Sequence, residues 1–327
     1  MKTLFTVTET IKLIESKKNL VLAADESLLL QLPKGNWIGG TIPYFMSENG
    51  GLFSKELIQV FTFPDFVSLA NTKFYSEKDL AEIPNDYPEN GFSFILIPSG
   101  SKTHLSYAEN CSAWRGFYDR PILGWITGVD LKEIGSKKAK VFNGTNLEQS
   151  DQEALVMHLI LPENRFSQIN ILNLFSQGTG DEISFNSTGF EIQDCLINGK
   201  ELNFSDYLQE IKADIQLPLV ANYNGAMINA SFQNIDSKEK KVLMYAPVFK
   251  GIKYKIAAPL KNYADQFATE VNKHKVTPDF SCNCILNYMY ADLTGKKTGE
   301  IKGPMTFGEI AYILLNQTIV YMTFETK

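Results

Sequence analysis

Short apolar runs, separated by helix and turn signals, constrain the fold of this chain more than any other feature. Three of them, Leu20–Ala24, Phe92–Pro98 and Ala154–Leu161, have the length and composition of buried strands. Helical patterns lie between such runs, and the first one begins at Thr6 and Glu9 with the spacing of a capping box. This alternation predicts an α/β fold with helices packed on mixed sheets, and a mixed α+β arrangement is the alternative.

The length of 327 residues favours two sheet-containing domains over a single core. Between residues 164 and 199 short apolar segments are separated by turn residues, and Asn198-Gly199 predicts a type I′ hairpin turn. An amphipathic helix is expected directly afterwards, at 205–213. We therefore predict one domain at 1–199 and a second at 200–327.

The remaining patterns predict further elements along the chain. A strand from 36 to 46 contains Gly39-Gly40, which indicates a bulge or a tight bend. Helices are expected at 102–111 and 263–273, and residues 280–290 should form a strand that runs into a helix. A last strand is expected at 317–324.

Composition and charge exclude several classes of function. The net charge of −6 and the three arginines argue against nucleic-acid partners and anionic membrane surfaces, which require a basic face. No apolar run approaches the roughly 18 residues of a membrane span. Four scattered cysteines and an amino terminus without a signal-peptide pattern indicate a cytoplasmic, reduced protein. We expect no cofactor, because the dinucleotide fingerprint is absent, and no structural metal, because Cys282 and Cys284 lack a second ligand pair.

Small polar groups near the carboxyl end are the best candidates for a ligand site. They lie at the ends of apolar runs, where side chains can point donors and acceptors into a cleft. The candidates are Ser281, Cys282, Asn283, Gly308, Glu309, Asn316 and Thr318. The alternative interpretation is structural: Asn316 and Thr318 would satisfy backbone groups at a strand start, and the cysteines would be small core residues.

Two places in the first half of the chain allow functional and structural interpretations. Gly39, Gly40 and Thr41 could hold an anion through backbone N–H groups, or they could simply accommodate a bend in the strand. Asp25, with its acidic neighbour at position 26, could bind a cation, but it also suits the first turn of a helix. His158 lies in an apolar strand pattern, which favours a hydrogen-bonded core residue. His274 lies between two lysines, as in a solvated turn.

The carboxyl-terminal motifs resemble those of FIST domains, which are sensory modules that bind small ligands. The family commonly shows Phe-Ser-Cys, then Gly-Glu-Ile, then Leu-His-Asn-Gln-Thr before the last strand. This chain shows Phe280-Ser281-Cys282, Gly308-Glu309-Ile310 and Leu315-Asn316-Gln317-Thr318 in the same order. It departs from the pattern at Leu315, where the family has histidine, and no arginine follows Cys282 closely.

The resemblance implies a noncatalytic sensory protein for signal transduction, whose ligand is an amino acid or a similar polar metabolite. Ser281, Asn283, Glu309, Asn316 and Thr318 would hold the polar end of the ligand, and the segment 39–41 would contribute from the other domain. A signalling protein partner is expected, because no output module follows in the sequence. The alternative from another class is a cysteine-dependent hydrolase or transferase with Cys282 as the nucleophile, which would require a lowered thiol pKa.

Overall fold

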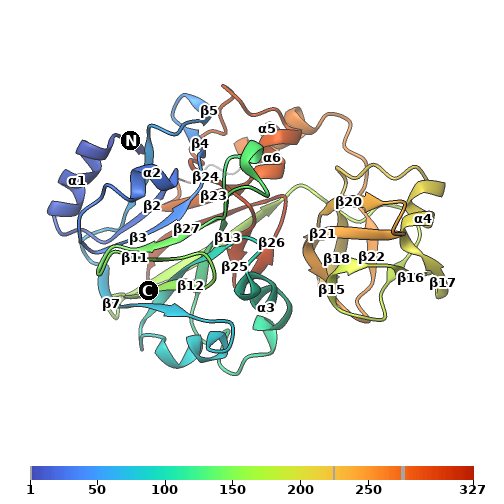
Figure 1. Cartoon of the computed structure of the whole chain (residues 1–327), viewed down its shortest axis with the longest axis horizontal. Coiled ribbons are helices and arrows are strands. Elements are labelled where there is room, and N and C mark those ends of the chain that lie inside the picture. Colours follow the sequence, from blue (N-terminus) through green and yellow to red (C-terminus); the bar gives the residue numbers. More distant parts are fainter. Residues whose placement is uncertain (1, 224, 274–276) are drawn as a thin grey trace.

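The computed structural model describes residues 2–223, 225–273 and 277–327, which form a large and a small lobe (Figure 1). Strands account for 43% of the chain and helices for 18%, so hydrogen-bonded sheets form the framework. The small lobe comprises residues 183–256, and the large lobe contains the chain on both sides of that segment. The fold is mixed α/β, which confirms the predicted class.

The first of three six-stranded sheets in the large lobe consists mainly of early strands, and we call it the amino-terminal sheet. In spatial order it contains β1 (Leu4–Phe5), β6 (Ile58–Thr62), β2 (Leu20–Ala24), β3 (Trp37–Thr41), β10 (Val141–Asn143) and β11 (Glu148–Ser150). Strands β2 and β3 are parallel, and the other pairs are antiparallel. Helices α1 (Val7–Glu15) and α2 (Glu26–Leu29) pack on its outer face.

The second sheet, the central sheet, joins strands from both ends of the chain. In spatial order it contains β26 (Ile313–Leu315), β25 (Glu309–Ala311), β9 (Ile122–Thr127), β8 (Gly91–Pro98), β12 (Ala154–Ile160) and β7 (Ser68–Tyr75). Helix α3 (Lys102–Asn110) connects the parallel strands β8 and β9. Short 3₁₀ turns follow β7, α3 and β9 at Leu80–Asp86, Cys111–Ala113 and Leu131–Glu133.

The third sheet, the carboxyl-terminal sheet, carries the predicted site residues Ser281, Cys282, Asn283 and Thr318. In spatial order it contains β13 (Arg165–Asn173), β27 (Thr318–Thr326), β23 (Phe280–Cys284), β24 (Gly303–Thr306), β4 (Tyr44–Ser47) and β5 (Gly50–Phe53). Helix α5 (Tyr263–Lys273) leads back from the small lobe, and α6 (Ile285–Tyr290) follows β23 directly. The strands β4 and β5 tie this sheet to the amino-terminal half of the chain.

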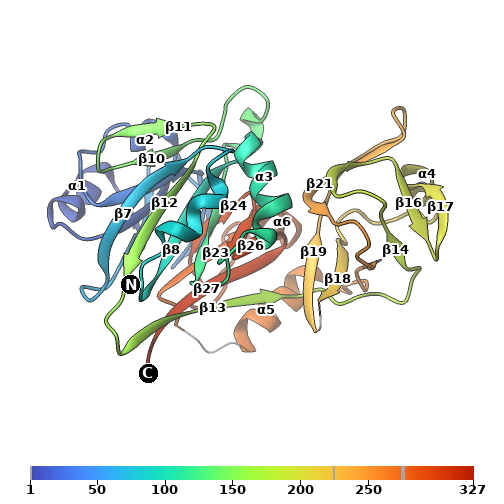
Figure 2. The same ribbon diagram turned by 90° about the horizontal axis from the view of Figure 1, so that it is seen from below.

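The small lobe consists of two antiparallel sheets and one helix around its own apolar core. The larger sheet contains β17 (Lys200–Asn203), β16 (Asp194–Ile197), β14 (Ile183–Ser184), β22 (Tyr254–Ile256), β18 (Leu219–Tyr223) and β19 (Ala226–Ala230). The smaller sheet contains β15 (Gly189–Ile192), β21 (Lys241–Val248) and β20 (Phe232–Asp236), and the helix is α4 (Phe204–Glu210). Figures 1 and 2 both place this lobe at one end of the molecule.

The two faces of the central sheet explain how the large lobe is layered. One face, which includes Phe94 and Trp125, packs against both of the other large-lobe sheets in a single apolar cluster. The opposite face, which includes Ile95 and Ile126, packs against α3 through Tyr107. The central sheet is therefore the common wall from which the amino-terminal and carboxyl-terminal sheets diverge.

Most elements predicted from the sequence are confirmed. The capping box at Thr6 is present, and Asp25 is the N-cap of α2, which confirms the helix interpretation of the acidic pair. Residues 280–290 form a strand that runs into a helix, and Asn198-Gly199 is a two-residue hairpin turn with φ of 49° and 84°. Among the described residues no helix is long and apolar enough to span a membrane.

The predicted division at residues 199/200 does not follow the hydrogen-bonded sheets. It falls inside the turn between β16 and β17, whose strands pair with each other. The chain after α5 then returns to the large lobe, where β27 pairs with β13 and β25 pairs with β9. The helix expected at 205–213 is α4, which belongs to the same small lobe as this hairpin and so does not open a new domain.

Candidate functional site

Among the predicted site residues, the largest connected group surrounds Glu309, a carboxyl group with no exposed surface. Its two oxygens accept hydrogen bonds from the hydroxyls of Thr306 (2.9 Å) and Thr318 (2.8 Å), and the Thr318 amide donates a longer one (3.4 Å). Burial raises the pKa of Glu309 from 4.5 to about 8, although these hydrogen bonds act in the opposite direction. The carboxyl group is therefore mostly protonated at neutral pH.

Asn283 and Asn287 extend the polar contacts of this region. The side-chain amide of Asn287 donates to Asn283 Oδ1 (2.9 Å) and to the Thr318 carbonyl (3.3 Å), and Tyr263 donates to Asn287 Oδ1 (2.5 Å). Both asparagines are almost fully buried. Because these groups bond to one another in the core, the predicted residues Asn283, Glu309 and Thr318 form a structural network rather than the wall of a cavity.

Asn316 and Gly308 have separate structural roles. The Asn316 carbonyl accepts a hydrogen bond from Asn229 of the small lobe (3.0 Å), and its own side-chain amide donates to the preceding carbonyl. The Gly308 carbonyl accepts a hydrogen bond from Ile126 (2.8 Å) and so holds β25 beside β9. Ser281 lines the cleft described below, but Glu309 and Asn316 do not. The prediction that these three residues converge on one recess is therefore wrong.

The glycines of β3 allow close packing of two sheets and do not form a bulge. Gly39 and Gly40 lie in a regular strand between β2 and β10. A Cβ atom on Gly40 would come within 2.5 Å of Thr127, in the central sheet. Thr41 exchanges hydrogen bonds with Lys140 through both its backbone and its hydroxyl, and it lies far along the chain from the polar network. The predicted bulge is wrong. Glycine is needed at position 40 because the central sheet lies too close to β3 for a side chain to fit between them.

The four cysteines are all free and buried. Burial raises the thiol pKa of Cys282 and Cys284 well above the ordinary value, and the nearby Glu309 raises both further. A nucleophilic cysteine needs access to substrate and a lowered pKa. Cys282 is instead buried and its thiol pKa is raised, which counts against the hydrolase or transferase alternative.

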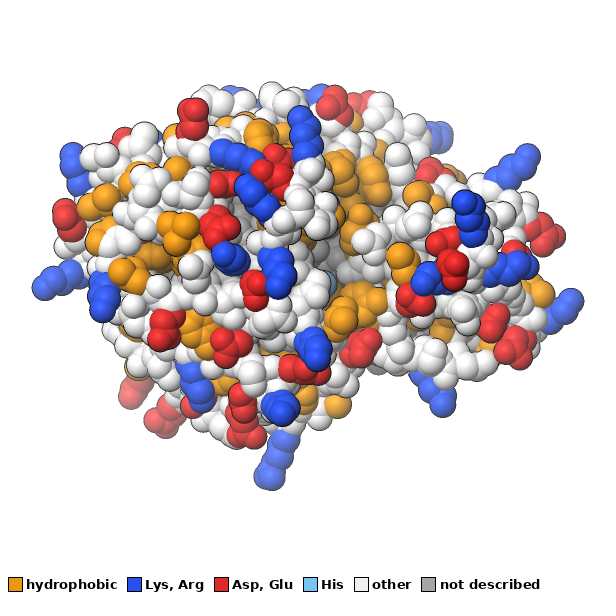
Figure 3. All heavy atoms as spheres, in the orientation of Figure 1, with side chains coloured by type: hydrophobic (Ala, Val, Ile, Leu, Met, Phe, Trp, Pro, Cys, Tyr) orange, Lys and Arg blue, Asp and Glu red, His pale blue; other side chains and the backbone are white. Residues whose placement is uncertain are grey.

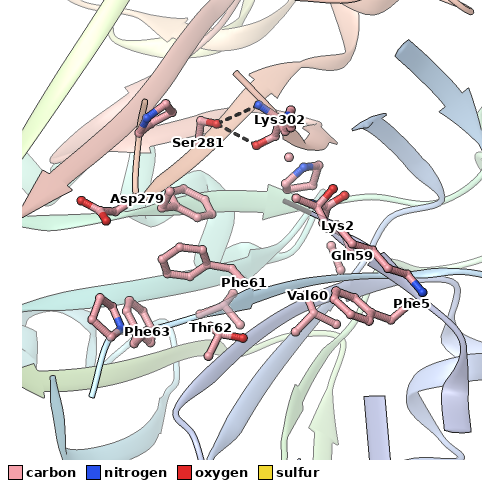
Figure 4. Close-up of a pocket in the computed structure, with 18 of the residues that line it drawn as sticks. Lys2, Phe5, Gln59, Val60, Phe61, Thr62, Phe63, Asp279, Ser281 and Lys302 are labelled. Carbon is pink, nitrogen blue, oxygen red and sulfur yellow. Dashed lines mark hydrogen bonds between the residues drawn. The ribbon is translucent and has the colours of Figure 1, made fainter. Parts of the chain in front are cut away.

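The largest cavity described here is a cleft of about 790 Å³ between the amino-terminal and carboxyl-terminal sheets (Figure 4). Strand β6 provides one wall through Gln59 to Phe63, and β23 provides the other through Phe280 and Ser281. Trp125 of the central sheet lines the cleft as well, and its ring stacks on Phe280 with centroids 5.9 Å apart. The cleft thus lies where the two sheets diverge from their common wall.

The cleft is mainly apolar, with a few polar groups in defined places. Phe61 and Phe280 meet edge to face at 5.3 Å, and Val21 and Ala23 of β2 line the same space. Gln59 Oε1 and Trp125 Nε1 are buried and have no hydrogen-bond partner within the described ranges. One is an acceptor and the other a donor, and neither atom has accessible surface towards the cleft.

Of the predicted residues, Ser281 lines this cleft, and the cleft's other main residues were missed. The signal was available in residues 57–63, where aliphatic and aromatic residues surround Gln59 and Thr62 in the pattern of a half-buried strand. Such a run does not reveal whether its apolar side chains meet another sheet or an open cleft. Only the three-dimensional structure, in which the two sheets diverge, shows that these side chains line an open cleft.

The two histidines that the structure describes, His104 and His158, are both buried. His158 is fully buried and bonded through Nδ1 to Ser93 (2.8 Å) and through Nε2 to Tyr75 (2.9 Å), which confirms the predicted core role. Burial lowers its pKa to about 4. His274 lies outside the described residues. Across residues 2–223, 225–273 and 277–327, no group of three His, Cys, Asp or Glu is arranged to hold a metal ion.

One protein-family model matches the chain from residue 5 to residue 325, and it describes a family of unknown function (DUF6976). No curated protein and no solved structure matches the chain.

Proposed function

We propose that this chain, which belongs to the DUF6976 family, binds a small molecule with an apolar body in the cleft between β6 and β23. The cleft itself carries the proposal. Its volume of about 790 Å³ lies in the range of roughly 300–1,000 Å³ that small-molecule sites occupy, and such sites combine apolar walls with a few placed polar groups.

The proposed role is noncatalytic. The cleft walls at Phe61, Phe63 and Phe280 provide surface for packing, and the ionisable residues that line the cleft are Lys2, Lys18, Asp65, Asp279, Glu300 and Lys302. Cys282, the nucleophile of the alternative hypothesis, is 1% exposed and has a raised pKa. Binding without conversion is what a sensory protein requires, and the FIST-like motifs remain the reason to infer that role and a signalling protein partner.

The apolar walls of the cleft restrict which polar metabolites of the predicted class can bind. An amino acid or similar metabolite would pack an aromatic or aliphatic side chain against Phe61 and Phe280. Ligands that are polar throughout would lose hydration against these rings without compensating hydrogen bonds. We therefore propose a metabolite with one polar end and an apolar body.

A thermal-shift screen with matched variants tests this proposal. Amino acids, aliphatic and aromatic carboxylates and the corresponding alcohols are added to the full chain, since a ligand that binds only the folded protein raises its melting temperature. Phe61→Ala should abolish the shift produced by any active compound, and Phe61→Leu should retain part of it. Phe166→Ala, the same change at a 40% exposed site outside the cleft, should leave it unchanged.

Two results would count against the cleft. In one, no compound in the screen raises the melting temperature of the unmodified protein. In the other, an active compound shifts Phe61→Ala as much as it shifts the unmodified protein, so that it must bind elsewhere.

A further inference from the structure

Three lysines lie at the mouth of the cleft, and Lys302 differs from the other two. Lys2 binds Glu9 at 2.6 Å, and Lys18 forms a close ion pair with Asp65. Within the described ranges, the carboxylate nearest to the Lys302 ammonium group is that of Glu300, 3.5 Å away and itself 63% exposed. Lys302 is thus the least neutralised of the three cations.

Lys302 is also the least exposed of these cations. Its side chain is 16% exposed, compared with 38% for Lys18 and 55% for Lys2. An ammonium group has three donors, and a single long ion pair at the surface leaves most of that capacity unused. A partly desolvated cation beside an apolar cleft gains more from an added anion than a solvated one does.

Ser281 holds the backbone of Lys302 in place. Its hydroxyl donates to the Lys302 carbonyl (2.7 Å) and accepts from the Lys302 amide (3.2 Å), as Figure 4 shows. The next residue, Gly303, packs so closely on β23 that a Cβ atom there would come within 1.9 Å of the Ser281 carbonyl. The stem of the lysine therefore starts from a fixed point, which reduces the entropy lost when its head group binds.

The acidic groups at the same mouth are largely engaged elsewhere. Asp65 is held by Lys18, and the Asp279 carboxylate accepts the Phe324 amide hydrogen (2.8 Å). Glu300 remains, on the solvent side of Lys302. These contacts limit the repulsion that an incoming anion would meet.

We infer that the ligand carries a carboxylate that Lys302 binds while its apolar body packs against Phe61 and Phe280, with Ser281 as the residue that positions Lys302. This inference rests on the proposed function of the cleft. It adds to that function a negative charge on the ligand, and it names Lys302 as the residue that selects for this charge.

Decanoate and decan-1-ol are suitable probes because they share an apolar body and differ in the head group. Binding to the full chain is measured by titration calorimetry at low ionic strength. Decanoate should bind about tenfold more tightly than decanol, as expected for one charge-assisted hydrogen bond. Added salt should weaken decanoate binding and leave decanol binding unchanged.

Two variants identify the residues responsible. Lys302→Gln should reduce decanoate affinity to that of decanol, whereas Lys102→Gln, a change at an exposed lysine of α3, should have no effect. Ser281→Ala should lower the affinity for decanoate severalfold without changing that for decanol, and Ser281→Thr should restore it.

The outcomes separate the two proposals. If both probes bind equally, or if Lys302→Gln keeps the preference for decanoate, the inference is overturned and the proposed function stands. If neither probe binds and the thermal-shift screen is also negative, the proposed function fails, and the inference fails with it.

Discussion

Replacing Glu309 with glutamine should change how the stability of the large lobe depends on pH. The folded protein keeps a proton on this carboxyl group up to a pKa of about 8, whereas the unfolded chain loses it near 4.5. Between these values the folded state binds more protons, so the stability that this group contributes is fully present below pH 4.5 and is lost as the pH rises towards 8. Glutamine has nearly the same shape and does not titrate. Its amide oxygen can accept from Thr318, and its amide nitrogen can donate to the Thr306 hydroxyl, which can rotate to accept.

The magnitude follows from the two pKa values. Each pKa unit corresponds to ~1.4 kcal/mol, so the ionisation of Glu309 removes on the order of 5 kcal/mol from the free energy of unfolding over the full range. About 2 kcal/mol of this loss falls between pH ~6.5 and ~8.5. The two buried histidines, His104 and His158, act in the opposite direction in this window. Burial lowers their pKa from 6.5 to about 4, so they add stability as the pH rises, and because an unfolded histidine is still half protonated at pH 6.5, each adds about 0.4 kcal/mol between pH ~6.5 and ~8.5. This contribution is the same in the unmodified protein and in Glu309→Gln.

Urea denaturation followed by tryptophan fluorescence measures this effect, because Trp37, Trp114 and Trp125 all lie in the large lobe with Glu309. Between pH ~6.5 and ~8.5 the stability of the unmodified protein should fall by about 2 kcal/mol relative to that of Glu309→Gln, because all other titrating groups are common to both. The control is Glu163→Gln, which makes the same change at an exposed site. A fall in stability of equal size in Glu309→Gln and the unmodified protein would refute the reasoning that burial keeps this carboxyl group neutral.

Three further outcomes are expected. In the folded protein, Cys282 and Cys284 should react with iodoacetamide far more slowly than the free amino acid cysteine does, because they are buried and their pKa is raised. In urea they should react at an ordinary rate. Fast labelling of the folded protein would restore the catalytic alternative. Gly40→Ala should destabilise the protein by about 1–3 kcal/mol through its contact with the central sheet, whereas Gly180→Ala, where no atom lies within 4 Å, should be nearly neutral in urea titrations. His158→Leu should cost ~1–3 kcal/mol, since the buried Ser93 hydroxyl loses its partner while Tyr75 keeps its bond to Asp86, and a cost below 1 kcal/mol would contradict the hydrogen-bonded role.

The local elements were predictable because their signals lie within a few residues. The Thr6 capping box, the Asp25 N-cap and the Asn198-Gly199 turn each depend on contacts between near neighbours in sequence. The grouping of strands was not predictable in this way. Strand β27 pairs with β13 across about 150 residues of intervening chain, and no local pattern encodes such a pairing.

The site was misplaced for a physical reason that the Glu309 network makes clear. Polar residues inside buried strands stand out in a sequence, but burial obliges them to find partners, and Glu309, Thr306 and Thr318 find them in one another. Residues that must bind a ligand need the opposite condition, which is unfilled space and unused bonding capacity. Here those properties belong to the ordinary-looking strand β6 and to Lys302, so the search for a ligand should begin where the sheets diverge and not where polar residues cluster.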